Sequence, residues 1–325
     1  MERVYRSSAA DAARVADVIL AENADEATLS VLKEVLALAM DASRSDNAAI
    51  RNWAIEAVDL ALDEYARPNG TFEEYDRASW IGPDEMWRTI PWGTAFRANE
   101  LLDVYQAFKD DLSPGQRARW EEVLRNSAAW VRGNPVVGSV VFNCAIDLCR
   151  FLWRAGSEFG DAGAVEWALR SGRERVRRDV DDDGWIHGEN KGVSGFYQLL
   201  GAELLAEFAW QSRDPELVEA ADRAATVILN FAAPDLLWPG NFGTRSDFLG
   251  PVRPRLIVLA AALGNKAAAA AIRANRVFKA SVSDEIWAAA LETGADPVVP
   301  VRVAEFPPVD ATVVREGPWQ AWFAG

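Results

Sequence analysis

The sequence contains one histidine, His187, in a place that suits a proton-transfer group. It lies in the polar, glycine-rich stretch 181–197, and Tyr197 follows it ten positions later. An imidazole and a phenol can each give or take a proton, and a loop that leads into a helix often presents such groups. A single histidine beside an aspartate run is also compatible with a surface or capping residue, so its role depends on what surrounds it.

Composition limits the partners that the chain can have. The 325 residues carry a net charge of −15, and half of them are hydrophobic. A folded chain of this sign lacks the basic face that nucleic acids and anionic membranes require, although a few local arginines could still hold an anionic substrate. No apolar run approaches the ~20 residues of a membrane span. We therefore expect neither nucleic-acid nor membrane partners, whereas the sequence leaves the oligomeric state open.

The N-terminus and the cysteines bear on the compartment and on metal binding. Residues 1–6 lack the apolar core of a signal peptide, so we expect a cytoplasmic protein unless a leader has been removed, in which case it is secreted. Cys144 and Cys149 are five positions apart in a helical pattern, which places them on different faces and predicts free, buried thiols. Two such cysteines and His187 cannot form a metal site. The sequence therefore predicts neither a metal nor a cofactor.

Helical periodicity dominates the first 290 residues and predicts an all-α chain. Ser113-Pro114 and Asp214-Pro215 each combine a capping residue with proline at the first helical position, so helices should begin there. Short polar connections favour antiparallel helical hairpins. Further helices are expected at about 93–109, 139–155, 163–178, 195–211, 254–264 and 266–279.

Three stretches break this rhythm. Residues 66–92 and 233–253 form long aromatic-rich connections, and the His187 loop is the third. Long loops with many aromatic residues are usually functional. From about residue 298, alternating apolar residues predict β-strands around Glu316-Gly317. We therefore expect a helical catalytic domain over 1–297 and a β-hairpin, or the start of a β-sandwich domain, over 298–325.

Four short segments follow one another along the chain: the aromatic residues 87–100, residues 142–147 with Asn143, residues 183–197 with His187 and Tyr197, and residues 243–246 with Arg245. Together they resemble the helical domain of family eight polysaccharide lyases, the group of the hyaluronan, chondroitin and xanthan lyases. In that family the corresponding segments carry an aromatic patch with a helix start, the catalytic asparagine, the histidine and tyrosine, and an arginine. Residues 309–315 also resemble the start of that family's β-sandwich. The resemblance implies an incomplete (α/α) toroid of antiparallel helical hairpins.

The resemblance also implies a function, which is β-elimination in a uronate-containing acidic polysaccharide. In that reaction a proton is removed beside the carboxylate, and the sugar oxygen two carbons away is expelled. Asn143 would stabilise the charge that develops on the carboxylate. Tyr197, aided by the cation Arg245, would transfer protons, and His187 would share that task or orient the sugar. The expected substrate-binding residues are Trp87, Arg88, Trp92, Glu189, Asn190 and Asn241.

Each of these residues also has a structural interpretation. Asn143 could be a buried hydrogen-bonding residue, Tyr197 a core tyrosine, and Arg245 the partner of a nearby carboxylate. Two other functions remain open as well. A carbohydrate-binding protein could keep the fold and the aromatic groove without turnover. A terpene cyclase would explain the Asp-x-Asp-Asp pattern of residues 179–182.

Overall fold

The computed structural model describes most of the chain. The described residues are 31–72, 86–134, 140–187, 194–232, 237–240, 248–275, 282–294, 303–306, 311–316 and 319–324. Side chains are not described for residues 86–92, Ala95, 237–240, 248–251 or any strand after residue 302. Among the predicted site residues, Glu189, Asn190, Asn241 and Arg245 lie outside the described residues.

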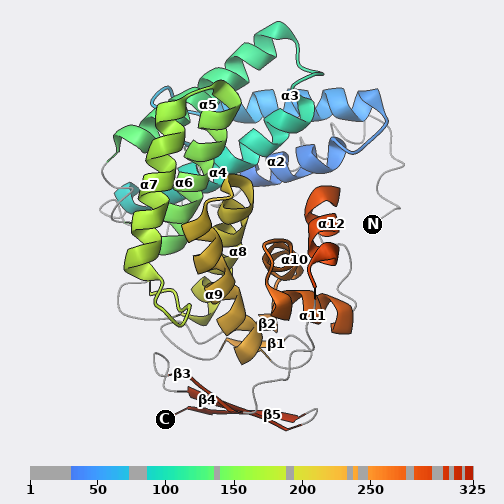
Figure 1. Cartoon of the computed structure of the whole chain (residues 1–325). Coiled ribbons are helices and arrows are strands. Elements are labelled where there is room, and N and C mark those ends of the chain that lie inside the picture. Colours follow the sequence, from blue (N-terminus) through green and yellow to red (C-terminus); the bar gives the residue numbers. More distant parts are fainter. Residues whose placement is uncertain are drawn as a thin grey trace. The chain divides into compact units, whose positions relative to one another are not determined.

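The described chain consists mainly of helices (Figure 1). They are α2 (Val31–Ala42), α3 (Ala48–Tyr65), α4 (Met86–Phe108), α5 (Pro114–Gly133), α6 (Phe142–Phe159), α7 (Ala162–Asp179), α8 (Gly195–Ser212), α9 (Pro215–Phe231), α10 (Pro254–Ala262), α11 (Lys266–Asn275) and α12 (Asp284–Glu292). Strands β1 (Leu237–Gly240) and β2 (Phe248–Pro251) form an antiparallel pair, and β3 (Val303–Phe306), β4 (Ala311–Glu316) and β5 (Trp319–Ala324) form an antiparallel sheet. The predicted helical chain with a short C-terminal β segment is confirmed.

The chain divides into two compact units, and helix α6 contributes to both. The first unit contains residues 1–140 and 151–165, and the second contains 141–150 and 166–325. This division lies inside the predicted helical domain. The predicted boundary at residue 297 stays a prediction.

Local capping chemistry explains where several helices begin. The Ser113 hydroxyl accepts from the Gln116 backbone N–H, the Gln116 side chain accepts from the Ser113 backbone, and Pro114 opens α5. Asp214 caps α9 in the same position relative to Pro215 and accepts from two backbone N–H groups of the first turn. Both helix starts predicted from these pairs are confirmed.

One predicted boundary was wrong. Residues 86–92 belong to α4 rather than to the connection predicted for 66–92, and the helix continues through Pro91. Proline inside a helix removes one backbone hydrogen bond, and α4 accommodates this loss. Helix α6 begins at Phe142, within three residues of the predicted start, and Asn143 lies in its first turn.

In the first unit, α2 packs against α3 and α4, and α4 packs against α5. Trp120 of α5 is fully buried, and its indole N–H donates to Asp59 Oδ1 of α3 at 2.7 Å. The core therefore contains a polar anchor that joins two helices.

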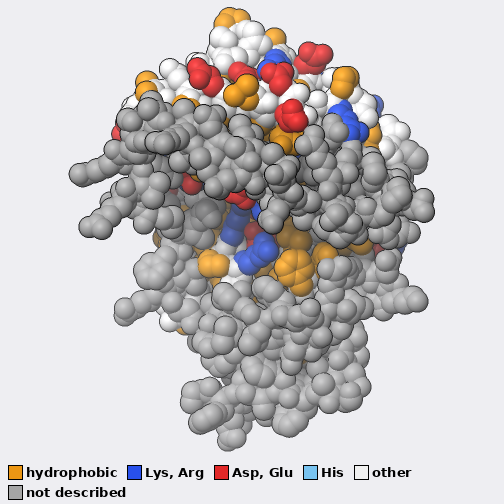
Figure 2. All heavy atoms as spheres, turned by 180° about the vertical axis from the view of Figure 1, so that it is seen from behind, with side chains coloured by type: hydrophobic (Ala, Val, Ile, Leu, Met, Phe, Trp, Pro, Cys, Tyr) orange, Lys and Arg blue, Asp and Glu red, His pale blue; other side chains and the backbone are white. Residues whose placement is uncertain are grey.

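At the top of Figure 2, acidic, basic and apolar side chains of the described residues are intermixed on the surface.

In the second unit, α8 is buried on nearly all sides. It packs against α9 and α10, and α10 packs in turn against α11 and α12. Thirteen of the residues of α8 are buried, including Glu203 and Glu207. A helix buried all round is normally apolar, so the two carboxylates must have partners inside the unit. No helix among the described residues is long and apolar enough to cross a membrane.

Candidate functional site

The loop that carries His187 is a narrow turn organised by Asp181. Val180 and Ile186 form an antiparallel bridge across it. Asp181 Oδ1 accepts from the backbone N–H groups of Asp183 at 3.1 Å and Trp185 at 2.8 Å. The other carboxylate oxygen, Oδ2, lies 2.6 Å from Nε2 of His187. One aspartate therefore shapes the turn and holds the imidazole.

Close packing fixes this loop on α9. Gly184 has φ +92°, and a methyl group at this position would lie 2.4 Å from the backbone oxygen of Arg223, so only glycine fits. Trp185 is fully buried and meets the Phe231 ring edge-on, with ring centroids 6.0 Å apart. The glycine and the tryptophan together anchor the loop, while His187 remains at the surface.

Gln198 fixes the same loop on the first turn of α8. Its side-chain oxygen accepts from the Ile186 N–H at 2.8 Å, and its amide donates to the Gly184 carbonyl at 3.0 Å. Gln198 is fully buried. Tyr197 is its neighbour in the sequence; it is half-buried, and its ring lies edge-on to Phe196 with centroids 5.2 Å apart. The segments that carry His187 and Tyr197 are thus joined.

The segment that carries Asn143 reaches the same place through Gly201. A methyl group at Gly201 would lie 3.0 Å from Cδ1 of Ile186 and 3.1 Å from Cδ1 of Phe142. Phe142 precedes Asn143, Ile186 precedes His187, and Gly201 is one helical turn after Tyr197. The close approach at Gly201 therefore gathers the segments of these three predicted site residues within the second unit. Asn143 itself is 5% exposed.

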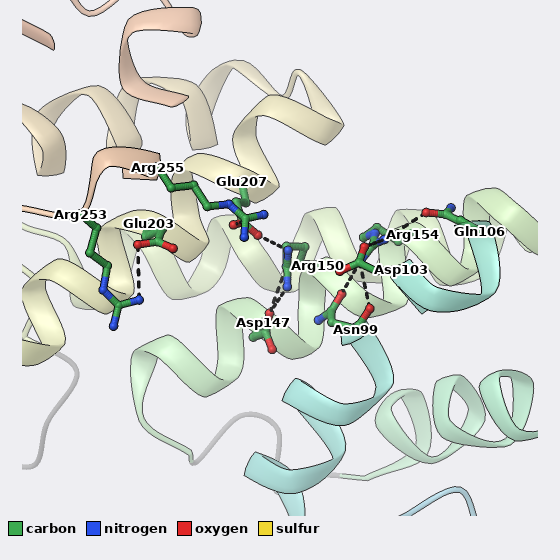
Figure 3. A network of polar contacts seen from close by, with 10 residues as sticks. All are labelled: Asn99, Asp103, Gln106, Asp147, Arg150, Arg154, Glu203, Glu207, Arg253 and Arg255. Atoms are coloured by element: carbon green, nitrogen blue, oxygen red, sulfur yellow. Dashed lines mark hydrogen bonds and ion pairs between the residues drawn. The ribbon is translucent and has the colours of Figure 1, made fainter. Parts of the chain in front are cut away.

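A buried ionic network in the second unit was not predicted from the sequence (Figure 3). Arg150 of α6 donates to Asp147 Oδ1 with two nitrogens, at 2.8 and 3.0 Å, and also pairs with Glu207 of α8. Arg255 of α10 holds the other oxygen of Glu207 at 2.6 Å. Asn143 shares a face of α6 with Asp147 and Arg150, because the three residues follow helical spacing. The face that bears the candidate amide is therefore polar.

Glu203 lies one turn before Glu207 on α8. Arg253 Nη1 is 3.4 Å from its carboxylate. Burial raises the pKa of Glu203 above its ordinary value, and the charge of Arg253 only partly offsets this effect. Perturbed carboxyls gather at functional sites, although structural ion pairs perturb them too. The sequence analysis did not single out Glu203 as a carboxyl with a raised pKa. Nothing in the residues near it along the chain marks it as buried.

A second set of buried contacts belongs to the first unit and is also drawn in Figure 3. Arg154 pairs with Asp103 and donates to Asn99 Oδ1 and Gln106 Oε1, each at 3.1 Å. These partners all lie on α4, so this arginine ties α6 to α4. We assign it a structural role.

The first unit also contains a cavity of about 550 Å³. Among its lining residues, Arg125 lies over the Phe159 ring, with its guanidinium carbon 4.3 Å from the ring centroid. Arg132 lies 3.3 Å from the Asp161 carboxylate. The lining otherwise consists of small or apolar residues and contains no histidine, tyrosine or cysteine. The cavity therefore lacks the acid–base groups of the second unit, and none of the predicted site residues lines it.

The two cysteines are free and buried, as predicted. Burial raises the pKa of Cys149 to about 12 and that of Cys144 well above its ordinary value. Thiols in this state are poor nucleophiles. Among the described residues, no group of three or more histidine, cysteine or acidic side chains is placed to hold a metal.

Two of the three aspartates in the pattern that suggested a terpene cyclase have local partners. Asp179 pairs with Arg175 at 2.7 Å and with Arg178 at 2.9 Å. Asp181 holds the turn and His187, and Asp182 is exposed. Structural contacts therefore account for Asp179 and Asp181.

The aromatic residues that were predicted to bind substrate near the start of α4 belong to the first unit. Trp87, Arg88 and Trp92 belong to the first turns of α4, where the structure describes the backbone but not the side chains. Their role as substrate-binding residues, like that of Glu189, Asn190 and Asn241, stays a prediction, and so does the catalytic role of Arg245.

No protein-family profile and no curated protein matches the sequence. Among solved structures, the chain is similar to a mutant of the chondroitin AC lyase of Streptomyces coelicolor A3, with a TM-score of 0.58 and 14% identity. This likeness covers 90% of the chain and 45% of the lyase, so the chain spans less than half of that protein's length. An unsaturated glucuronyl hydrolase specific for heparin is similar over 75% of this chain and 68% of its own, with a TM-score of 0.47 and 14% identity. The likeness to the lyase confirms the fold that the sequence resemblance implied: the chain is an α/α toroid.

Proposed function

We propose that this chain is a lyase that cleaves a uronate-containing acidic polysaccharide by β-elimination. The observation that carries the proposal is the close approach at Gly201, which gathers the segments of Asn143, His187 and Tyr197 in one unit. The shared fold with a chondroitin AC lyase supports the same substrate class.

Asn143 would act on the carboxylate of the uronate. The proton beside a carboxylate is barely acidic, because removing it adds a second negative charge to the same group. An amide donor in the first turn of α6 can hydrogen-bond the carboxylate, and the helix N-terminus favours negative charge there. The position of Asn143 thus suits the stabilisation of an enolate-like intermediate.

Tyr197 would be the proton-transfer centre, with His187 as its neighbour. A phenolate takes the proton beside the carboxylate, and the resulting phenol can return a proton to the leaving sugar oxygen when both lie on one face. A phenol has a pKa near 10 and requires a cation to favour its ionised form. Arg245 is the residue that we propose for this task.

The test compares the lyase product formed by the wild type and by Tyr197→Phe. Each is incubated with hyaluronan, chondroitin, xanthan, alginate and heparin, and the ultraviolet absorbance of the unsaturated uronate end is followed. We expect the wild type to act on at least one polymer and Tyr197→Phe to lose at least 100-fold in kcat, the lower range for losing a general acid–base group.

Tyr105→Phe is the matched control. Tyr105 is a buried tyrosine of the first unit whose hydroxyl donates to Glu121 at 2.8 Å. Its loss should leave turnover within a few-fold of wild type. Binding without product formation, unchanged in Tyr197→Phe, would instead identify a carbohydrate-binding protein. Equal turnover by Tyr197→Phe and the wild type would reject the proposed mechanism.

A further inference from the structure

The Asp181–His187 contact fixes more than the shape of a loop. Oδ1 of Asp181 is occupied by the N–H groups of Asp183 and Trp185, so the carboxylate cannot rotate without breaking the turn. Oδ2 is thereby aimed at Nε2 of His187, 2.6 Å away. The backbone N–H of His187 donates to the Asp179 carbonyl at 2.8 Å, which fixes the backbone from which the side chain extends.

This arrangement selects one tautomer of the imidazole. An ionised carboxylate accepts hydrogen bonds only, so the nitrogen that faces it must carry a proton. In neutral imidazole the other nitrogen then has a free lone pair. A carboxylate that orients a histidine in this way is a recurrent device for fixing which nitrogen can act as a base.

We propose that Asp181 is a positioning residue for His187: it holds the imidazole as the Nε2–H tautomer and leaves Nδ1 as the acceptor. This inference rests on the proposed function for its catalytic meaning, since Nδ1 would accept a hydrogen bond from the bound sugar or a proton in the elimination. The tautomer itself is a property of the free protein and can be measured without any substrate.

The chain is well suited to the measurement because it has a single histidine. In the full-length, ¹⁵N-labelled protein without a histidine tag, every imidazole signal belongs to His187. At pH 8, where free imidazole is neutral, long-range ¹H–¹⁵N correlation distinguishes the two tautomers. We expect the wild type to show predominantly the Nε2–H form.

Asp181→Asn should invert the tautomer with little change in the turn. The amide oxygen can keep the hydrogen bonds from Asp183 and Trp185, while the amide nitrogen becomes a donor toward Nε2. Nε2 must then be the acceptor, so the proton moves to Nδ1. Asp182→Asn, an exposed neighbour in the same turn, is the matched control and should keep the wild-type pattern.

Three results would overturn the inference. They are an Nδ1–H form in the wild type, a doubly protonated ring at pH 8, and the same tautomer in the wild type and a folded Asp181→Asn. Thermal unfolding shows whether Asp181→Asn is folded; if it is not, the wild-type tautomer alone decides the question.

The activity measurement is separate. If the wild type cleaves a polymer, Asp181→Asn should lose at least tenfold in kcat with KM within a few-fold of wild type, whereas a loosened fold would raise KM as well. An Nε2–H tautomer in a protein that cleaves none of the polymers would reject the proposed function and keep the positioning role. An Nδ1–H tautomer in a protein that does cleave a polymer would reject the positioning role of Asp181 and keep the proposed function.

Discussion

Glu203 is a carboxylate that α8 holds away from water. Its pKa lies above the ordinary 4.5 because of burial, despite Arg253. Between the unfolded and folded pKa values, the folded chain keeps a proton that the unfolded chain has lost. The free energy of unfolding therefore falls as pH rises through that window, and the ionised group is a cost to the fold at neutral pH.

Replacing Glu203 by glutamine should remove this cost. Urea unfolding of the wild type and Glu203→Gln at pH 4 and pH 7 gives the difference in stability at each pH. From pH 4 to pH 7, we expect the free energy of unfolding of Glu203→Gln to rise relative to that of the wild type. The reason is that glutamine cannot ionise and can still accept a hydrogen bond from Arg253. Glu219→Gln, at an exposed position on α9, controls for the loss of one charge. A shift in favour of the wild type would contradict the assigned pKa direction.

The residues that could be predicted from sequence are those whose type is unusual or whose contacts are local. His187 stood out because it is the only histidine, and its partner Asp181 is six positions away. Arg150 and Glu207 could not be found in this way. They are 57 positions apart, and their pairing depends on α6 meeting α8, which no local pattern encodes.

At the scale of elements, the loop of His187 depends on one side chain of α8. Gln198 satisfies a donor and an acceptor of the loop backbone, and both would be left without a partner in Gln198→Leu. Each orphaned buried group costs about 1–3 kcal/mol. We expect Gln198→Leu to lower the free energy of unfolding by about 2–6 kcal/mol, measured in urea.

The same helix offers a control of the same residue type. Gln211 of α8 is half-buried, and its side-chain oxygen has no hydrogen-bond partner among the residues that the structure describes. Gln211→Leu should therefore change the stability by less than about 1 kcal/mol, since no pairing of that oxygen is lost. Equal losses in the two variants would show that Gln198 contributes only through its size.

Helix starts show which parts of the fold the sequence encodes locally. Ser113 and Asp214 cap their helices through atoms two or three positions away, so their patterns sufficed to predict α5 and α9. The start of α4 was misplaced because residues 86–92 were counted with the aromatic-rich connection that precedes them, whereas they lie inside the helix. The convergence at Gly201 joins residues from three segments and required the structure.

For the whole molecule, the sign of the charge matters for the proposed substrate. The chain carries −15, and an acidic polysaccharide is itself a polyanion. The two repel each other at long range, whereas recognition of the uronate depends on short-range contacts with amides and arginines. The long-range part is screened at about 0.1 M salt, where the Debye length is about 10 Å.

The kcat/KM on an active polymer should therefore rise when sodium chloride increases from about 0.01 to about 0.1 M, since only the repulsion is lost over that range. A short oligosaccharide of the same polymer, which carries fewer charges, should show a much smaller change. A steep fall over the same range would mean that attraction by a basic surface dominates the encounter, contrary to the composition.

The sharing of α6 between the two units has a consequence for how the protein is made. A ribosome delivers residues 141–150 before any other part of the second unit, and delivers 151–165 only after most of the first. Neither unit is therefore complete as a contiguous stretch of nascent chain. The first must wait for the end of α6, while the segment bearing Asn143 emerges before α8, whose Gly201 lies against Phe142. Such ordering ties the maturation of the candidate site to the synthesis of the residues that follow position 165.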